Sequence, residues 1–209
     1  MPPVFGSVFL WILTTILWWS GWRKETTEGI PHWAVGFFLA VWPLALLSDI
    51  VVTSTYSVNG AELWTMLAAL AMLGRLRPAR ILMSISAGVL IGSIYLLLSR
   101  LLLHPSGITH YFAPWGAAIL VGWLAALLLR YAVEQFVAVS AGLLICEIMT
   151  NLLMTSSEFA PIVKASGWME AWWIAVLYAR LWSVSIQSIT VQLKRWALKW
   201  GWTRGGQSS

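Results

Sequence analysis

The stretch that decides the fold class is residues 75–103, RLRPARILMSISAGVLIGSIYLLLSRLLL. Three arginines crowd its first six positions, and Pro78 prevents a preceding helix from continuing. From Ile81 to Leu103 the sequence is apolar for longer than the ~20 residues that a helix needs to cross a bilayer. Hydrocarbon offers the backbone no hydrogen-bond partner, so this run is predicted to be a transmembrane helix.

Six further apolar runs lie on either side of this one. They are continuous, unlike the alternating ~10-residue strands of a membrane barrel. The sequence therefore predicts an all-α transmembrane bundle in residues 1–193 and a basic cytosolic tail in residues 194–209. Whether the shortest run crosses the membrane fully is left open. The predicted spans are about 4–22, 33–56, 61–74, 81–103, 113–129, 136–154 and 168–193.

The composition agrees with a protein surrounded by lipid. Of 209 residues, 59% are hydrophobic and only 10% are charged, whereas a soluble domain carries about 25% charged residues. The mean hydropathy is +0.78. These values exclude a disordered chain and an ordinary cytosolic enzyme, and the single cysteine, Cys146, excludes a disulfide scaffold. The net charge is +5, and the basic residues lie between the apolar runs and in the tail. This distribution is typical of a membrane topology signal and not of a nucleic-acid-binding surface, so no nucleic-acid partner is predicted.

The basic residues predict the orientation of the chain. With seven spans, one side holds only Arg100 and Lys164, and the other holds ten Lys and Arg residues. The positive-inside rule then places the N-terminus outside and the C-terminus in the cytosol. If the run at 61–74 did not cross, the division would be eight against four, which is less clean. The first run precedes Arg23 and Lys24 and is expected to be an uncleaved span rather than a signal peptide.

Among the ionisable residues inside predicted spans, three stand out: Asp49, Glu147 and Arg180. Each costs at least ~2.5–3.5 kcal/mol at a helix centre, so each is a candidate functional residue. Counted at 1.5 Å per residue, Glu147 and Arg180 come to similar depths and are predicted to face each other, whereas Asp49 lies near the outer side. The pair is either a structural clasp or part of an ion or substrate path. Polar residues at helical spacing support it, namely Ser140, Thr150 and Asn151 beside Glu147, and Ser183 and Gln187 beside Arg180.

Small residues recur at four-residue spacing on three predicted helices. Such stripes let helix backbones approach closely in lipid. We expect packing within one chain here, rather than a seam between two copies. The stripes are Ser84, Gly88 and Gly92, then Ala118, Gly122 and Ala126, then Ala138, Gly142 and Cys146.

Many of the tryptophans lie near the predicted ends of the spans, where indoles form an interfacial belt. The less favoured alternative is an aromatic box for a ligand. The residues concerned are Trp18, Trp19, Trp22, Trp33, Trp64, Trp115, Trp168, Trp172 and Trp173.

The tail combines cations with indoles. Each cation near an anionic leaflet contributes about 1 kcal/mol, so the tail is predicted to bind anionic lipids at the cytosolic surface. Its residues are Lys194, Arg195, Trp196, Lys199, Trp200, Trp202 and Arg204.

No catalytic or cofactor motif appears in the sequence. His32, His104 and His110 all fall in predicted loops, so neither a haem nor a metal site is predicted, and no span carries a lysine for a Schiff base. We therefore expect a non-enzymatic multi-pass membrane protein with a structural or assembly role in the cell envelope. The alternative is a small transporter or channel that uses the region of Glu147 and Arg180.

In its layout the chain resembles the YphA-like membrane proteins of spore-forming Gram-positive bacteria. The shared features are about 200 residues, many tryptophans and almost complete embedding in the membrane, along the whole chain. The resemblance implies a bacterial inner or plasma membrane and brings no catalytic residues with it.

Overall fold

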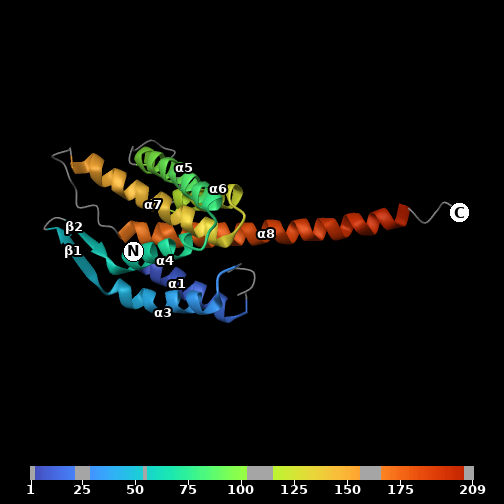
Figure 1. Ribbon diagram of the computed structural model, residues 1–209, viewed down its shortest axis with the longest axis horizontal. Coiled ribbons are helices and arrows are strands. Elements are labelled where there is room, and N and C mark those ends of the chain that lie inside the picture. Colours follow the sequence, from blue (N-terminus) through green and yellow to red (C-terminus); the bar gives the residue numbers. More distant parts are fainter. Residues whose placement is uncertain (1–2, 22–28, 54–55, 103–114, 156–165, 205–209) are drawn as a thin grey trace.

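The computed structural model describes residues 3–21, 29–53, 56–102, 115–155 and 166–204 (Figure 1). These residues form helices and one two-stranded hairpin, so the helical class is confirmed. The elements are α1 (Pro3–Trp19), α3 (His32–Leu46), β1 (Asp49–Thr53), β2 (Tyr56–Asn59), α4 (Gly60–Leu73), α5 (Pro78–Leu102), α6 (Gly116–Leu128), α7 (Ala132–Thr155) and α8 (Ser166–Arg204).

Three of these helices are long and apolar enough to cross a membrane. The qualifying segments are Pro78–Ser99 in α5, Ala132–Thr150 in α7 and Gly167–Trp196 in α8. Helices α1, α3, α4 and α6 are apolar but shorter. By length and composition, three helices of the described chain could therefore cross a membrane.

The predicted span at 33–56 is wrong in its second half. Helix α3 ends at Leu46, and the chain then forms the antiparallel hairpin of β1 and β2. The sequence from Ile50 to Val58 is rich in β-branched residues, which favour strands over helices. Asn59 holds the base of the hairpin: its amide donates to Leu46 O (3.1 Å) and Asp49 Oδ1 (2.9 Å). Its side-chain oxygen also caps α4.

Consecutive helices run in opposite directions between two ends of the bundle. On α7 and α8, Trp172 Nε1 donates to Ser140 Oγ (2.9 Å), and Arg180 lies beside Gln135, so the two helices are antiparallel. In Figure 1, the hairpin and the N-terminus lie at one end, and α8 projects from the other.

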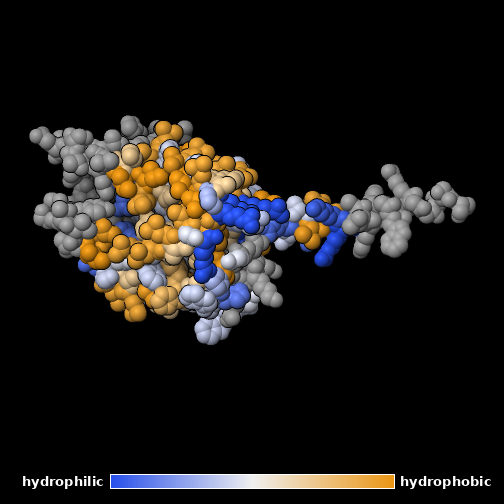
Figure 2. Space-filling model, in the orientation of Figure 1, coloured by the Kyte–Doolittle hydropathy of each residue, from blue (hydrophilic) through white to orange (hydrophobic). Residues whose placement is uncertain are grey.

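The two ends differ in charge. The end with the hairpin, here called the acidic end, holds Asp49, Glu62 and Glu170; Trp115 Nε1 donates to Glu170 Oε1 (2.8 Å) there and joins α6 to α8. The opposite end, here called the basic end, holds Arg75, Arg77, Arg80 and Arg130. Figure 2 shows hydrophilic side chains gathered where α8 leaves an otherwise largely hydrophobic flank.

A clamp at the basic end ties α5 to α7. Arg80 Nη1 lies 3.1 Å from Glu134 Oε1, and the Arg80 guanidinium lies 4.3 Å from the centre of the Tyr131 ring. The clamp combines an ion pair with a cation–π contact.

The core contains aromatic rings that the sequence assigned to the interface. Trp168, Trp172 and Trp173 are all buried, which corrects their assignment to the belt. The Trp172 ring lies 5.0 Å from that of Trp173 and 5.4 Å from that of Phe136, in edge-to-face contacts. These indoles therefore pack between helices.

The small-residue stripes pack one helix of this chain against another. A Cβ atom added at Gly88 would lie 3.0 Å from Ala138 O, and one at Gly92 would overlap the Gly142 backbone. A Cβ atom at Gly122 would lie 2.5 Å from Ala175 O. The glycines thus allow close α5–α7 and α6–α8 packing.

The seventh helix does not end where its apolar run ends. Helix α8 continues unbroken through 39 residues to Arg204, so it is about 58 Å long and absorbs most of the predicted tail. The described side chains from Ser188 to Trp196 are exposed, so this part of α8 lies at the outside of the bundle. Lys194 and Arg195 belong to this exposed segment.

Candidate functional site

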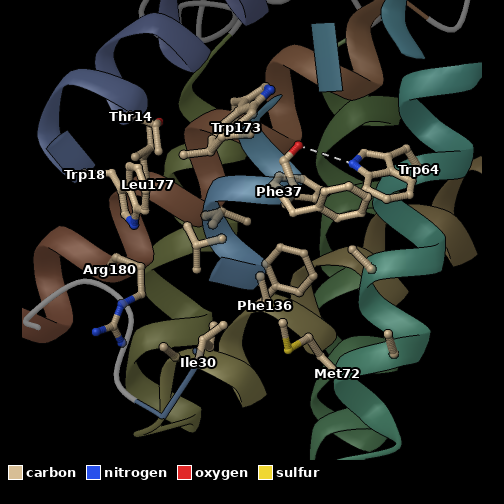
Figure 3. A pocket seen from close by; sticks show the side chains of 18 of the residues that line it. Thr14, Trp18, Ile30, Phe37, Trp64, Met72, Phe136, Trp173, Leu177 and Arg180 are labelled. Carbon is tan, nitrogen blue, oxygen red and sulfur yellow. Dashed lines mark hydrogen bonds between the residues drawn. The ribbon is translucent and has the colours of Figure 1, made fainter. Parts of the chain in front are cut away.

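A cavity of about 490 Å³ lies among α1, α3, α4, α7 and α8 (Figure 3). Its walls are almost entirely apolar, and aromatic rings supply much of them. The aromatic lining residues are Trp18, Trp33, Phe37, Phe38, Trp64, Phe136, Trp172 and Trp173. Five of the tryptophans assigned to a belt therefore line this cavity, which supports the aromatic box that was the less favoured alternative.

The walls of the cavity consist of residues that recur at helical spacing on α4 and α8. On α4 the lining residues follow one face at spacings of three and four residues, and two of them, Ala68 and Ala71, are too small to fill the space. The α8 wall has the same periodicity. The α4 wall is Trp64, Leu67, Ala68, Ala71 and Met72, continued by Arg75 just after the helix, and the α8 wall is Trp172, Trp173, Val176, Leu177 and Arg180.

The cavity opens between α3 and α4. Trp33 and Phe37 on α3, Leu67 on α4 and Arg75 just after α4 line it and are also exposed. Toward the acidic end, Trp64 closes the gap: its Nε1 donates to the backbone oxygen of Phe38 (3.3 Å), and its ring packs edge-on against Phe37. The mouth is therefore lateral and lies toward the basic end.

A buried arginine lies at the basic end of the cavity. Figure 3 shows Arg180 at the opposite end from Trp173. Arg180 is 8% exposed, and its Nη1 lies 3.4 Å from Gln135 Oε1. Gln135 is itself fixed by donating to Leu129 O (2.8 Å). Arg180 and Arg75 are the two cations among the described lining residues, which include no carboxylate.

The structure does not place Glu147 and Arg180 in direct contact, contrary to the sequence prediction. Arg180 lies beside Gln135, and Glu147 lies twelve residues further along α7, which is about 18 Å. The predicted depths were counted from the apolar edges of the two runs. The contact between Trp172 and Ser140 fixes how α8 lies along α7. In this register, Arg180 lies closer to the basic end than its distance from the start of the apolar run predicts.

The acidic neighbour of Glu147 is a residue that the sequence reasoning missed. Glu62, in the first turn of α4, is 4% exposed, and its Oε1 has no hydrogen-bond partner among the described residues. Glu147 and Asp49 both lie within electrostatic range of its carboxyl group. Glu62 stands at the edge of an apolar run, so nothing in the sequence indicated that it would be buried. A buried carboxylate is nevertheless a candidate functional residue at the end of a helix as well as at its centre.

The other predicted site residues are spread over the bundle. Ser183 is buried, Thr150 and Gln187 are half-buried, and Asp49 is exposed at the hairpin. Ala118 and Gly122 are buried and Ala126 is half-buried, on the face of α6 that meets the core. Ser84 is buried on α5, and Lys194, Arg195 and Trp196 are exposed.

Some predicted residues cannot be placed. His104, His110 and Trp22 lie outside the described residues, as do the side chains of Asn151, Lys199, Trp200, Trp202 and Arg204. Within the described part of the chain, no three His, Cys, Asp or Glu side chains gather in a way that would hold a metal ion.

Comparisons with family models, curated proteins and solved structures give no match for this chain. The resemblance to the YphA-like family accordingly stays a prediction.

Proposed function

We propose that this chain is a non-enzymatic, multi-pass membrane protein that binds an amphipathic, anionic lipid. The apolar chains of the lipid occupy the aromatic cavity, and its negative group lies at Arg180. One observation carries the proposal: a lateral cavity with apolar walls has a buried cation at one end.

The chemistry of the cavity favours this ligand over a water-soluble one. A polar solute would lose its hydration against aromatic walls that offer few hydrogen bonds, whereas acyl chains lose nothing by leaving bulk lipid. A guanidinium in apolar surroundings attracts an anion, and its charge-assisted hydrogen bonds are each worth about 1.5–3 kcal/mol. The apolar lining also argues against a water-filled path, so lipid binding is preferred to the channel alternative.

In the proposed membrane setting, all seven described helices cross the bilayer, with the N-terminus outside and the basic end in the cytosol. The concentration of Arg75, Arg77, Arg80 and Arg130 at one end supports this orientation. The mouth between α3 and α4 then opens into the cytosolic leaflet. A bacterial inner or plasma membrane fits this arrangement.

Labelling of single cysteines tests the orientation. In a Cys146→Ala background, Ile50→Cys on the hairpin should react with an impermeant maleimide added outside intact cells. Arg77→Cys should react only after the cells are opened. Both native side chains are exposed, so accessibility is not limited by packing. Labelling of both from the same side would refute the proposed crossing pattern.

The binding proposal is tested by replacing the buried cation. In the detergent-purified full chain, Arg180→Gln should weaken the binding of dioctanoyl phosphatidylglycerol at least about tenfold, because a desolvated charge pair is lost. Binding of dioctanoyl phosphatidylcholine should change much less. Native mass spectrometry over a lipid titration measures both. Equal phosphatidylglycerol affinity in the wild type and Arg180→Gln would contradict the proposal.

Two matched controls accompany this experiment. Arg77→Gln removes an exposed arginine that does not line the cavity and should leave the affinity unchanged. Ala68→Phe fills the cavity from α4 and should lower the affinity for both lipids. Leu70→Phe, which changes the exposed face of the same helix, should not. If Ala68→Phe binds both lipids as the wild type does, the acyl chains are not in this cavity.

A further inference from the structure

A second pocket, of about 450 Å³ and here called the polar pocket, lies at the basic end, and most of its lining residues have polar or charged side chains, unlike those of the first. Two cations, Arg130 and Lys194, stand on its rim, together with the amide of Gln187 and the hydroxyl-bearing residues Tyr131 and Thr190. There is no carboxylate among its described lining residues. Its chemistry is that of an anion site.

The polar pocket adjoins the basic end of the aromatic cavity. Gly29 and Tyr131 line the polar pocket, and their chain neighbours Ile30 and Ala132 line the aromatic cavity. The two pockets also share a single face of α8, because spacings of three and four residues connect Arg180 to Lys194. The residues on this face are Arg180, Ser183, Gln187, Thr190, Val191 and Lys194.

The distance along α8 shows how far a headgroup would extend. Gln187 lies seven residues beyond Arg180 and Lys194 lies fourteen, which is about 10 Å and about 21 Å along the helix axis. The long side chains of Arg180 and Lys194 can cover part of the larger distance, and the headgroup must span the rest. One phosphodiester carries one negative charge, so a single cation at the position of Arg180 is enough to bind it. Arg130 and Lys194, further along, are suited to a second and separate negative group.

Resting on the lipid binding proposed above, we propose that the headgroup carries a terminal phosphomonoester that binds Arg130 and Lys194 in the polar pocket. The phosphodiester next to the acyl chains lies at Arg180, and a sugar-sized spacer joins the two phosphates. Two exposed cations bind free phosphate only weakly in water. A phosphate attached to a lipid that is already held in the aromatic cavity has a high effective concentration at these cations, and this strengthens its binding.

Two lipids that differ only in this phosphate test the inference. The detergent-purified full chain is titrated with dioctanoyl phosphatidylinositol and with dioctanoyl phosphatidylinositol 4-phosphate, and native mass spectrometry reports both affinities. The wild type should prefer the 4-phosphate about tenfold. Lys194→Ala and Arg130→Ala should each remove most of this preference while leaving phosphatidylinositol binding within about twofold.

A matched control lies beside Lys194. Arg195 carries the same charge and is exposed, but it does not line the polar pocket. Arg195→Ala should therefore keep the preference for the 4-phosphate. If Arg195→Ala and Lys194→Ala reduced it equally, the preference would reflect the general charge of α8, and the site would be wrong.

The remaining outcomes separate this inference from the function on which it rests. Saturable and equal binding of both lipids would overturn the phosphomonoester site and leave the aromatic cavity intact as a lipid site. Failure of both lipids to bind saturably would overturn the proposed function as well. Millimolar inorganic phosphate should not abolish the preference; if it does, the pocket is a site for free phosphate and not for a lipid headgroup.

Discussion

Replacing Trp172 by alanine is expected to destabilise the protein by about 3–5 kcal/mol, the usual range for a large aromatic residue removed from a core. Trp172 is 1% exposed and contacts Phe136 and Trp173 edge-to-face. Its Nε1 donates to Ser140 Oγ, so truncation also leaves a buried hydroxyl on α7 without this partner. The loss should appear as a lower midpoint of thermal unfolding in mild detergent.

The comparison with Trp19 makes this prediction specific. Trp19 is 74% exposed at the end of α1, and Trp19→Ala should change the unfolding midpoint little. Trp172→Phe keeps most of the ring contacts but loses the hydrogen bond, and its midpoint should fall between the other two. Similar midpoints for Trp172→Ala and Trp19→Ala would show that Trp172 lies at a lipid interface, as the sequence alone predicted, and not in the core.

Gly92→Leu is expected to have the second large effect, because it forces α5 away from α7. A Cβ atom at Gly92 already overlaps the backbone of Gly142, and a backbone cannot move aside as a flexible side chain can. Overpacking a tight core costs about 1–3 kcal/mol, and a helix–helix crossing built on glycine lies at the upper end of this range or beyond it. The variant should show a clearly lower unfolding midpoint and a reduced yield of folded protein.

Gly167 provides the matched control, since a Cβ atom there would meet no atom within 4 Å. Gly167→Leu introduces the same side chain in a helix of the same bundle and should leave the midpoint nearly unchanged. Wild-type stability in Gly92→Leu would mean that α5 and α7 do not cross at these residues.

The helical class and most helix positions were accessible from the sequence because long apolar runs, if lipid surrounds them, obey a simple rule. A backbone in hydrocarbon must satisfy its own hydrogen bonds, so an apolar run of sufficient length predicts a helix. The shortest predicted run, 61–74, corresponds closely to α4 at Gly60–Leu73. The rule fails for apolar residues that lie outside the helices of the bundle. After Leu46, β-branched residues form a hairpin, and hydropathy alone does not distinguish such a segment from a helix.

The candidate site depended on the register between helices, which no single run encodes. The sequence identified Arg180 as important but paired it with Glu147, because it measured depth from the ends of the apolar runs. Packing of Trp172 against Ser140 shifts α8 along α7 and places Arg180 beside Gln135. The same packing turns tryptophans expected at the interface into the wall of a cavity.

The sequence by itself determined that the structure is helical and that its cations gather between particular helices, and it predicted that lipid surrounds the chain. These properties follow from composition and from position along the chain. Only the tertiary structure decided which side chains meet: the aromatic cavity, the burial of Glu62 and the neighbours of Arg180. The reason is physical, since contacts between helices depend on the volume and shape of facing side chains, and hydropathy measures neither.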